Sequence, residues 1–166
     1  MDKIMQIKKL FIFTLLIAGL AACGSKEMKN APAFTFKNIE GKKQSLADFK
    51  GKYVLLHFWT TACRSCRKDF PKIEEYYSEI KGKEFELVAI NVGEDLKASE
   101  KFQKKFQLSF PMLGDVQGVT EDLYQLEAFP TNIFIAPDGK IIRTIVGPVI
   151  DKNQVEVVIN QHKKKG

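Results

Sequence analysis

A cysteine pair at the end of an apolar run most constrains the fold of this chain. Residues 53–59 form a strand-prone, apolar stretch, and three residues later Cys63 and Cys66 follow with two residues between them. Residues 63–80 predict a helix, which places the Cys63 sulfur at a helix N-terminus, where unpaired N–H groups and the helix dipole stabilise a thiolate. Because a thiolate beside a second thiol is a redox centre, the pair predicts an enzyme.

The third cysteine, Cys23, follows an N-terminal export signal. Three lysines precede an apolar run over residues 10–20, and its 11 residues are well short of the roughly 20 that span a bilayer as a helix. The run ends in Leu20-Ala21-Ala22-Cys23, which resembles the lipobox of bacterial lipoproteins. We expect residues 1–22 to be a lipoprotein signal peptide and Cys23 to carry the lipid that anchors the chain to a membrane. The alternative is an ordinary signal peptide with small residues at its cleavage site.

Composition is consistent with one exported domain. Removal of residues 1–22 leaves 144 residues and lowers the formal net charge from +6 to +4, which fits a tether at 23–32 and one domain at 33–166. No basic stripe with interleaved aromatic residues is visible, so no nucleic-acid partner is expected. Export predicts an extracytoplasmic location, where disulfides form. A disulfide between Cys63 and Cys66 would close too small a loop to stabilise much, so the pair indicates chemistry.

The rest of the chain alternates strands and helices. Strands are expected at 34–36, 53–59, 85–92, 110–113, 133–136 and 140–146, and helices at 45–49, 63–80, 95–106, 116–126 and 151–162. The tripeptide at 137–139 predicts a turn between the last two strands. This order predicts an α/β fold with a mostly parallel sheet and a late antiparallel hairpin.

Three segments resemble the TlpA/ResA-like family of thioredoxin-fold proteins. They are residues 58–71 with the cysteine pair, residues 91–94, and residues 129–140 with Phe-Pro-Thr and a later Asp-Gly-Lys. The resemblance covers residue 33 to the C-terminus and implies a thioredoxin fold: a central mixed sheet, flanking helices and an N-terminal strand or hairpin extension. It also implies thiol–disulfide exchange with protein substrates, and no cofactor or metal is expected. Ala62 and the Arg64-Ser65 dipeptide depart from residues common in relatives.

Within that resemblance, four residues carry the expected chemistry. Cys63 is the attacking thiolate and Cys66 the resolving thiol, which releases the reduced substrate. Asp69 lies three residues beyond Cys66 on the same helix face, at a position where the family places a glutamate, and is expected to accept the Cys66 proton. Glu94 follows the end of a strand, where sites of α/β proteins gather, and is a second candidate acid. Either carboxylate could instead be a solvated surface group.

The resemblance also implies a substrate surface. The Phe129–Pro130 bond is expected to be cis and to face the dithiol, so that the Phe129 backbone can pair with an extended peptide. Thr131 and Trp59 complete the expected substrate contacts, although Trp59 could be a simple core aromatic. His57 is expected to be a core histidine.

Other chemistries fit the sequence less well. A zinc site would need two more ligands, and His57 and His162 are poorly placed for it. Haem attachment would need a histidine where Arg67 stands, and a peroxiredoxin-type peroxidase would need a proline where Leu56 stands. A Cu(I)-binding chaperone stays open as the alternative binding module, because an exported dithiol binds Cu(I) readily.

The direction of electron transfer and the partner proteins are predicted from the resemblance alone. It implies a reductase of disulfides in exported protein clients, fed electrons by a membrane thiol carrier, with apocytochrome c as a candidate client during cytochrome c maturation. A disulfide-donating oxidase or isomerase of secreted proteins is the rival, because thioredoxin-like pairs span roughly −270 to −120 mV.

Overall fold

The structure is a computed structural model that describes residues 28–82, 84–149 and 151–164. The expected signal peptide, Cys23 and residues 24–27 of the tether lie outside this range. Residues 29–31 pair with the turn at 139–141: the Ala31 N–H donates to the Gly139 carbonyl at 2.9 Å, and the Ile141 N–H donates to the Lys29 carbonyl at 2.9 Å. Residues 29–31, which lie within the expected tether, therefore pack against the domain. No helix among the described residues is long and apolar enough to cross a membrane.

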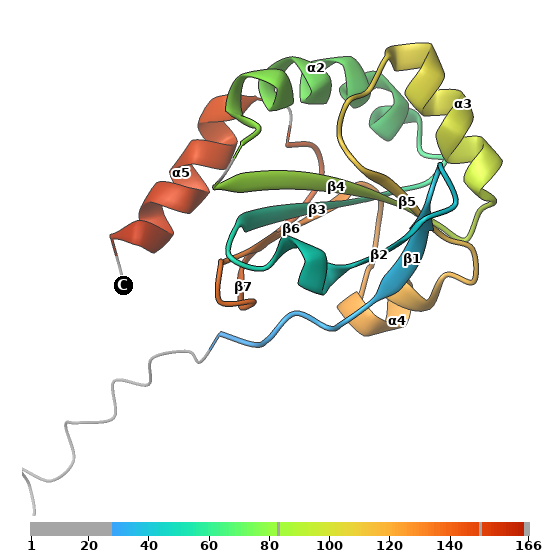
Figure 1. The fold of residues 1–166 in the computed structure, drawn as a ribbon. Coiled ribbons are helices and arrows are strands. Elements are labelled where there is room, and N and C mark those ends of the chain that lie inside the picture. The colour runs from blue at the N-terminus through green and yellow to red at the C-terminus, as the bar shows by residue number, and fades with distance from the viewer. Residues whose placement is uncertain (1–27, 83, 150, 165–166) are drawn as a thin grey trace, which may run out of the picture.

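Seven strands form one sheet in the order β2-β1-β5-β4-β3-β6-β7 (Figure 1). They are β1 (Thr35–Asn38), β2 (Lys43–Ser45), β3 (Tyr53–Trp59), β4 (Phe85–Val92), β5 (Met112–Asp115), β6 (Thr131–Ile135) and β7 (Ile141–Val146). The pairs β3–β4 and β4–β5 are parallel, and the other four pairs are antiparallel. The mixed sheet and the N-terminal hairpin are confirmed, whereas the expectation of a mostly parallel sheet is wrong. Among the described residues, β3–β4 and β4–β5 are the neighbouring pairs whose connection runs through a helix, α2 and α3 respectively, and parallel neighbours require such crossovers.

Helices cover both faces of the sheet (Figure 1). They are the 3-10 turn η1 (Leu46–Phe49), α2 (Arg64–Ile80), α3 (Leu96–Phe106), α4 (Val119–Tyr124) and α5 (Lys152–Lys163). Helices α2, α3 and α5 lie on one face, and η1 and α4 lie on the other. Several boundaries differ from expectation by a few residues, and two of the differences have a clear physical cause. Strand β5 starts after Pro111, which has no N–H to donate to a ladder, and α4 starts only after Gly118, whose φ is 69°.

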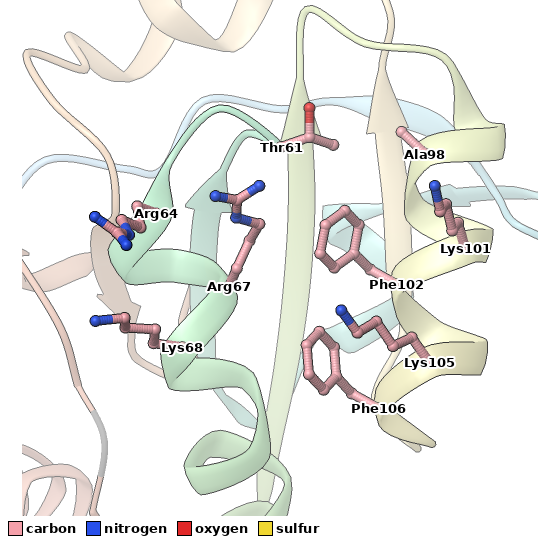
Figure 2. Close-up of a pocket in the computed structure, with 9 residues that line it drawn as sticks. All are labelled: Thr61, Arg64, Arg67, Lys68, Ala98, Lys101, Phe102, Lys105 and Phe106. Carbon is pink, nitrogen blue, oxygen red and sulfur yellow. The ribbon is translucent and has the colours of Figure 1, made fainter.

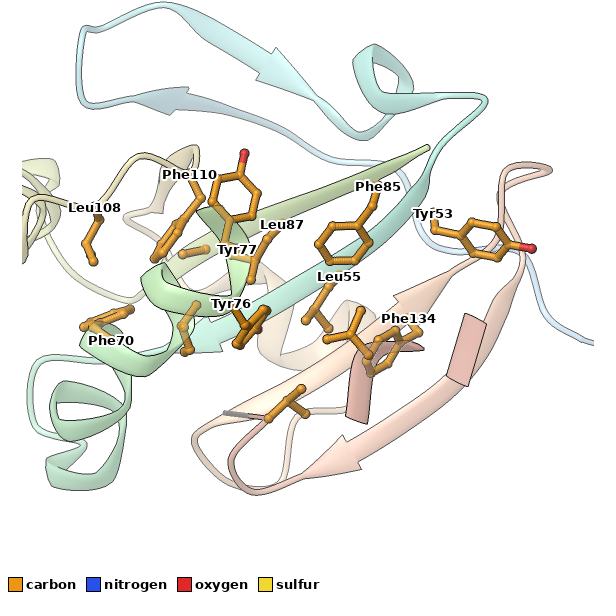
Figure 3. Packing of buried hydrophobic residues seen from close by; sticks show 14 of the residues in the cluster. Tyr53, Leu55, Phe70, Tyr76, Tyr77, Phe85, Leu87, Leu108, Phe110 and Phe134 are labelled. Carbon is orange, nitrogen blue, oxygen red and sulfur yellow. The ribbon is translucent and has the colours of Figure 1, made fainter. Parts of the chain in front are cut away.

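Strand β3 carries both halves of the core, because its side chains alternate between the two faces. Leu55 and Trp59 face α2, where they join Phe70 in one buried cluster. Figure 3 shows Leu55 and Phe70 within this cluster. Leu56 and Phe58 join the second cluster, under α4 and η1. A strand buried on both faces explains the continuous apolar run of residues 53–59. This packing fixes the end of β3, from which the cysteine pair continues.

Candidate active site

The dithiol lies where β3 passes through a three-residue loop into α2. Cys63 is the N-cap of α2, and its sulfur is bonded to that of Cys66, with 5.4 Å between the two Cα atoms. The Cys66 N–H donates to Cys63 Sγ at 3.2 Å, as a helix N-terminus does for an anion. Cys66 is 0% exposed, whereas Cys63 is only half-buried. Cys63 is thus the sulfur that a substrate can reach, and Cys66 the internal one.

Glu94 ties the loop in front of Cys63 to strand β4. Its carboxylate accepts hydrogen bonds from the Thr61 N–H at 2.8 Å, from the Thr61 hydroxyl, and from Asn91 Nδ2 at 2.6 Å. Asn91 is fully buried and also donates to the Trp59 carbonyl at 3.4 Å. The hydrogen bonds of Glu94 therefore go to the loop and the strand rather than to a sulfur. The structure gives Glu94 the geometry of a positioning residue, which departs from its expected place among the catalytic groups.

Asp69 lies on α2, one turn beyond Cys66, with one oxygen turned inward. Its Oδ2 is buried and has no hydrogen-bond partner among the described residues. Burial raises the pKa of the Asp69 carboxyl above its usual 3.8, against the opposing charges of Lys72 and Lys68. A half-buried carboxyl with a free inward oxygen and a raised pKa is suited to receive a proton.

The Phe129–Pro130 peptide bond is cis. Thr131, the first residue of β6, lies opposite Phe58 in the β3–β6 ladder. Pro130 therefore lies at the level of Trp59, at the same sheet edge as the loop that leads to Cys63. The Pro130 carbonyl accepts the Gly147 N–H at 2.8 Å, and Phe129 is half-buried and precedes the strand. The Phe129 backbone is thus placed before the ladder begins, where an extended peptide can pair with it.

Trp59 and Thr131 do not present their side chains at the surface, which departs from the expected contact with substrate. Trp59 is 0% exposed and packs edge-on against Phe70 and Phe102, with ring centroids 4.8 and 5.2 Å apart. The Thr131 hydroxyl donates to the Ala128 carbonyl at 2.6 Å. Both side chains are therefore buried within the domain, next to the loop and the strand that form the site.

His57 is a core histidine, as expected. It lies on the α2 face of β3, its Nδ1 is 2.8 Å from Asn132 Oδ1, and its Nε2 is buried without a partner among the described residues. Burial lowers the pKa of His57 to about 4, and the hydrogen bond with Asn132 opposes this only in part. The imidazole is therefore neutral at pH 7.

A groove between α2 and α3 adjoins the dithiol (Figure 2). We call it the basic groove; it is lined by Thr61, Arg64, Arg67, Lys68, Ala98, Lys101, Phe102, Lys105 and Phe106. The groove brings five cationic side chains beside Phe102 and Phe106, a grouping that the sequence analysis did not single out. The Lys-Phe pairs at 101–102 and 105–106 were the available signal, since residues four apart share a helix face. The remaining cations of the groove, Arg64, Arg67 and Lys68, lie on α2. Only the fold places α2 beside α3. Among the described residues no group of three His, Cys, Asp or Glu is placed to hold a metal.

Comparison with known proteins agrees with this geometry. Residues 28–144 match the AhpC/TSA family. The chain is 34% identical over 140 residues to the thiol-disulfide oxidoreductase ResA of Bacillus subtilis, covering 84% of this chain and 77% of that protein. Among solved structures, StoA from Bacillus subtilis superposes with a TM-score of 0.64 at 28% identity, over 78% of this chain and 96% of that one. A thiol-disulfide oxidoreductase from Bacteroides fragilis gives 0.68 at 29% identity, over 78% and 99%.

The fold and the bonded cysteine pair thus define a thioredoxin-fold thiol–disulfide oxidoreductase. The chain belongs to the AhpC/TSA family, and its relatives within that family include thiol-disulfide oxidoreductases named ResA. The predicted thioredoxin fold and the predicted enzyme class are confirmed.

Proposed function

We propose that this oxidoreductase reduces disulfides in exported protein clients. The observation that carries the proposal is the asymmetry of the pair: a reachable Cys63 at a helix N-terminus above a fully buried Cys66. The first thiol is set to attack a large substrate, and the second is set to complete the exchange without meeting solvent.

The exchange proceeds in two displacements. The Cys63 thiolate attacks one sulfur of the client disulfide; that bond breaks, and the other client sulfur leaves as a thiolate. Cys66, deprotonated with Asp69 as the acceptor, then attacks Cys63 Sγ and displaces the remaining client sulfur. The client gains two electrons and two protons, and the enzyme is left with the Cys63–Cys66 disulfide seen in the structure. A membrane thiol carrier is proposed to restore the dithiol, and apocytochrome c is one candidate client.

The same proposal places the enzyme outside the cytoplasm, anchored through lipid on Cys23. The lipobox-like residues 20–23 and the export signal before them support it. Mass spectrometry of the chain isolated from a bacterial membrane tests the anchor, because removal of residues 1–22 with a diacylglyceryl adduct on Cys23 is expected. An unmodified Cys23 thiol would contradict it.

The midpoint potential of the Cys63/Cys66 couple tests whether the enzyme reduces or oxidises its clients. A protein lacking residues 1–23 is equilibrated in defined thiol buffers with a Cu(I) chelator, and the dithiol fraction is read by alkylation and mass. We expect a value near or below about −250 mV, which requires a dedicated electron source. A value near about −120 mV would instead assign a disulfide-donating oxidase.

Replacement of Asp69 by Asn tests the proton acceptor. We expect the mixed disulfide of Cys63 to resolve about a hundredfold more slowly at neutral pH, at the low end of what general acid–base groups contribute. In the wild type the resolution rate falls at acidic pH as the carboxylate, with its raised pKa, is protonated. In Asp69→Asn the part of this fall that the carboxylate causes should be absent, and only the fall that any thiol attack shows as the thiol becomes protonated should remain. Asp122→Asn, exposed on α4, is the matched control, and equal profiles for Asp69→Asn and this control would remove Asp69 from the mechanism.

A further inference from the structure

We propose that the basic groove is the docking site for an acidic segment of the protein client, adjacent to the cysteine under attack. The inference rests on the proposed reductase function and names the class of client that it selects. The groove has a volume of about 630 Å³ and runs between α2 and α3 (Figure 2). It begins at Thr61 and Arg64, which flank Cys63 in the chain. A client whose disulfide reaches Cys63 therefore lies at the mouth of this groove.

The charge of the groove has one sign. Five cationic side chains line it and no carboxylate does: Arg64, Arg67 and Lys68 from α2, and Lys101 and Lys105 from α3. Among the described residues, none of these five cations takes part in an ion pair. On α3 it is instead the neighbouring Lys104 that pairs with Glu100. Lys68 also lies near Asp69, outside the lining. Cations left unpaired in a concave surface focus the field and concentrate anionic partners there.

The floor of the groove is aromatic and fixed. Phe102 and Phe106 stack on each other with ring centroids 6.0 Å apart, and Phe102 packs on the buried Trp59. The ammonium of Lys105 lies 5.2 Å from the centroid of the Phe106 ring. Half-buried rings under a rim of cations suit a peptide that offers apolar side chains to the floor and carboxylates to the rim. Continuity with Cys63 favours a protein client over a lipid headgroup, because only the client must reach the sulfur.

The test compares peptides that differ only in flanking charge. The full chain, with its dithiol reduced, is mixed with single-cysteine peptides carrying a pyridyl disulfide, flanked by glutamates, by glutamines or by lysines. Release of pyridine-2-thione gives the rate constant for attack on each. The variants are Lys101→Glu with Lys105→Glu, and as a matched control Lys37→Glu with Lys43→Glu. Lys37 and Lys43 are exposed, lie opposite each other in the β1–β2 hairpin, and do not line the groove.

We expect the wild type and the control to attack the glutamate peptide about tenfold faster than the lysine peptide at low ionic strength, a difference that salt should erase. In the groove variant the ratio should fall to one or below. Each ratio compares the rate constants of two peptides on the same variant. A change in the intrinsic reactivity of Cys63 affects both rate constants equally and therefore leaves the ratio unchanged.

Three outcomes overturn the inference. A wild-type ratio near one, with the glutamine peptide still reduced, rejects acidic docking while leaving the proposed function intact. Absence of attack on all three peptides instead sinks the proposed function itself, and this inference with it. If the ratio is near one and the groove variant loses selective binding to phosphatidylglycerol over phosphatidylcholine vesicles, the groove belongs to anionic lipid and the client assignment is wrong.

Discussion

Replacement of Cys66 by Ser should trap the client on Cys63 and lower steady-state reductase activity by at least about a thousandfold. The second displacement is intramolecular, and well-oriented intramolecular steps reach effective molarities on the order of 10⁵ M, far above any external thiol. In the structure the Cys66 N–H already contacts Cys63 Sγ and the two sulfurs are bonded. A serine hydroxyl cannot displace a thiolate, so the covalent complex should persist.

The measurement is non-reducing electrophoresis and intact mass after mixing the variant with a disulfide-bonded client. Cys66→Ser should give one adduct per chain, and Cys63→Ser none, because the remaining Cys66 is 0% exposed. The two variants remove the same number of sulfur atoms, so each is the matched control of the other. Adducts of equal yield on both variants would show that the sulfurs are not divided into an attacking and a resolving thiol.

Local patterns were sufficient for the dithiol and its scaffold. The apolar run of residues 53–59, the two-residue spacing and the following helix each follow from short-range rules of burial and capping. The structure confirms the strand and the helix. It also confirms the cis Phe129–Pro130 bond, which the family resemblance implies and local patterns do not. The largely antiparallel pairing of the strands could not be predicted in this way. It depends on which strands become neighbours, for example on the return of β6 beside β3, and no local pattern encodes that.

The hydrogen bonds that Glu94 makes at the site could not be predicted from the sequence either, because they join residues that are far apart in the chain. Asn91 and Thr61 are both held by Glu94, yet they are 30 residues apart in the chain, and their polar side chains read locally as strand-end and loop residues. The family resemblance predicts that Trp59 contacts substrate, with a core aromatic as the alternative. Alternation along β3 instead points its ring inward under α2 and α3. The basic groove likewise exists only once the two helices lie side by side.

His57 should make the folded state strongly dependent on pH between 6.5 and 4. Its pKa is lowered from 6.5 to about 4 by burial, so between these values the unfolded chain binds a proton that the folded chain excludes. Stability is fully present above pH 6.5 and declines as pH falls toward 4, below which both states are protonated. At about 1.4 kcal/mol per pKa unit, the loss attributable to His57 is roughly 3 kcal/mol.

Urea unfolding of the oxidised protein at several pH values measures this dependence. Carboxylates contribute to the same acid loss in every variant, so the difference in slope between wild type and His57→Gln isolates the imidazole. His57→Gln should be less stable at pH 7, because the edge-on contact of His57 with Phe70 is lost, and should show a much flatter slope between pH 6.5 and 4. If His57→Gln kept the wild-type slope, the buried imidazole would have to be protonated alike in the folded and unfolded chains, and the neutral core histidine would be refuted.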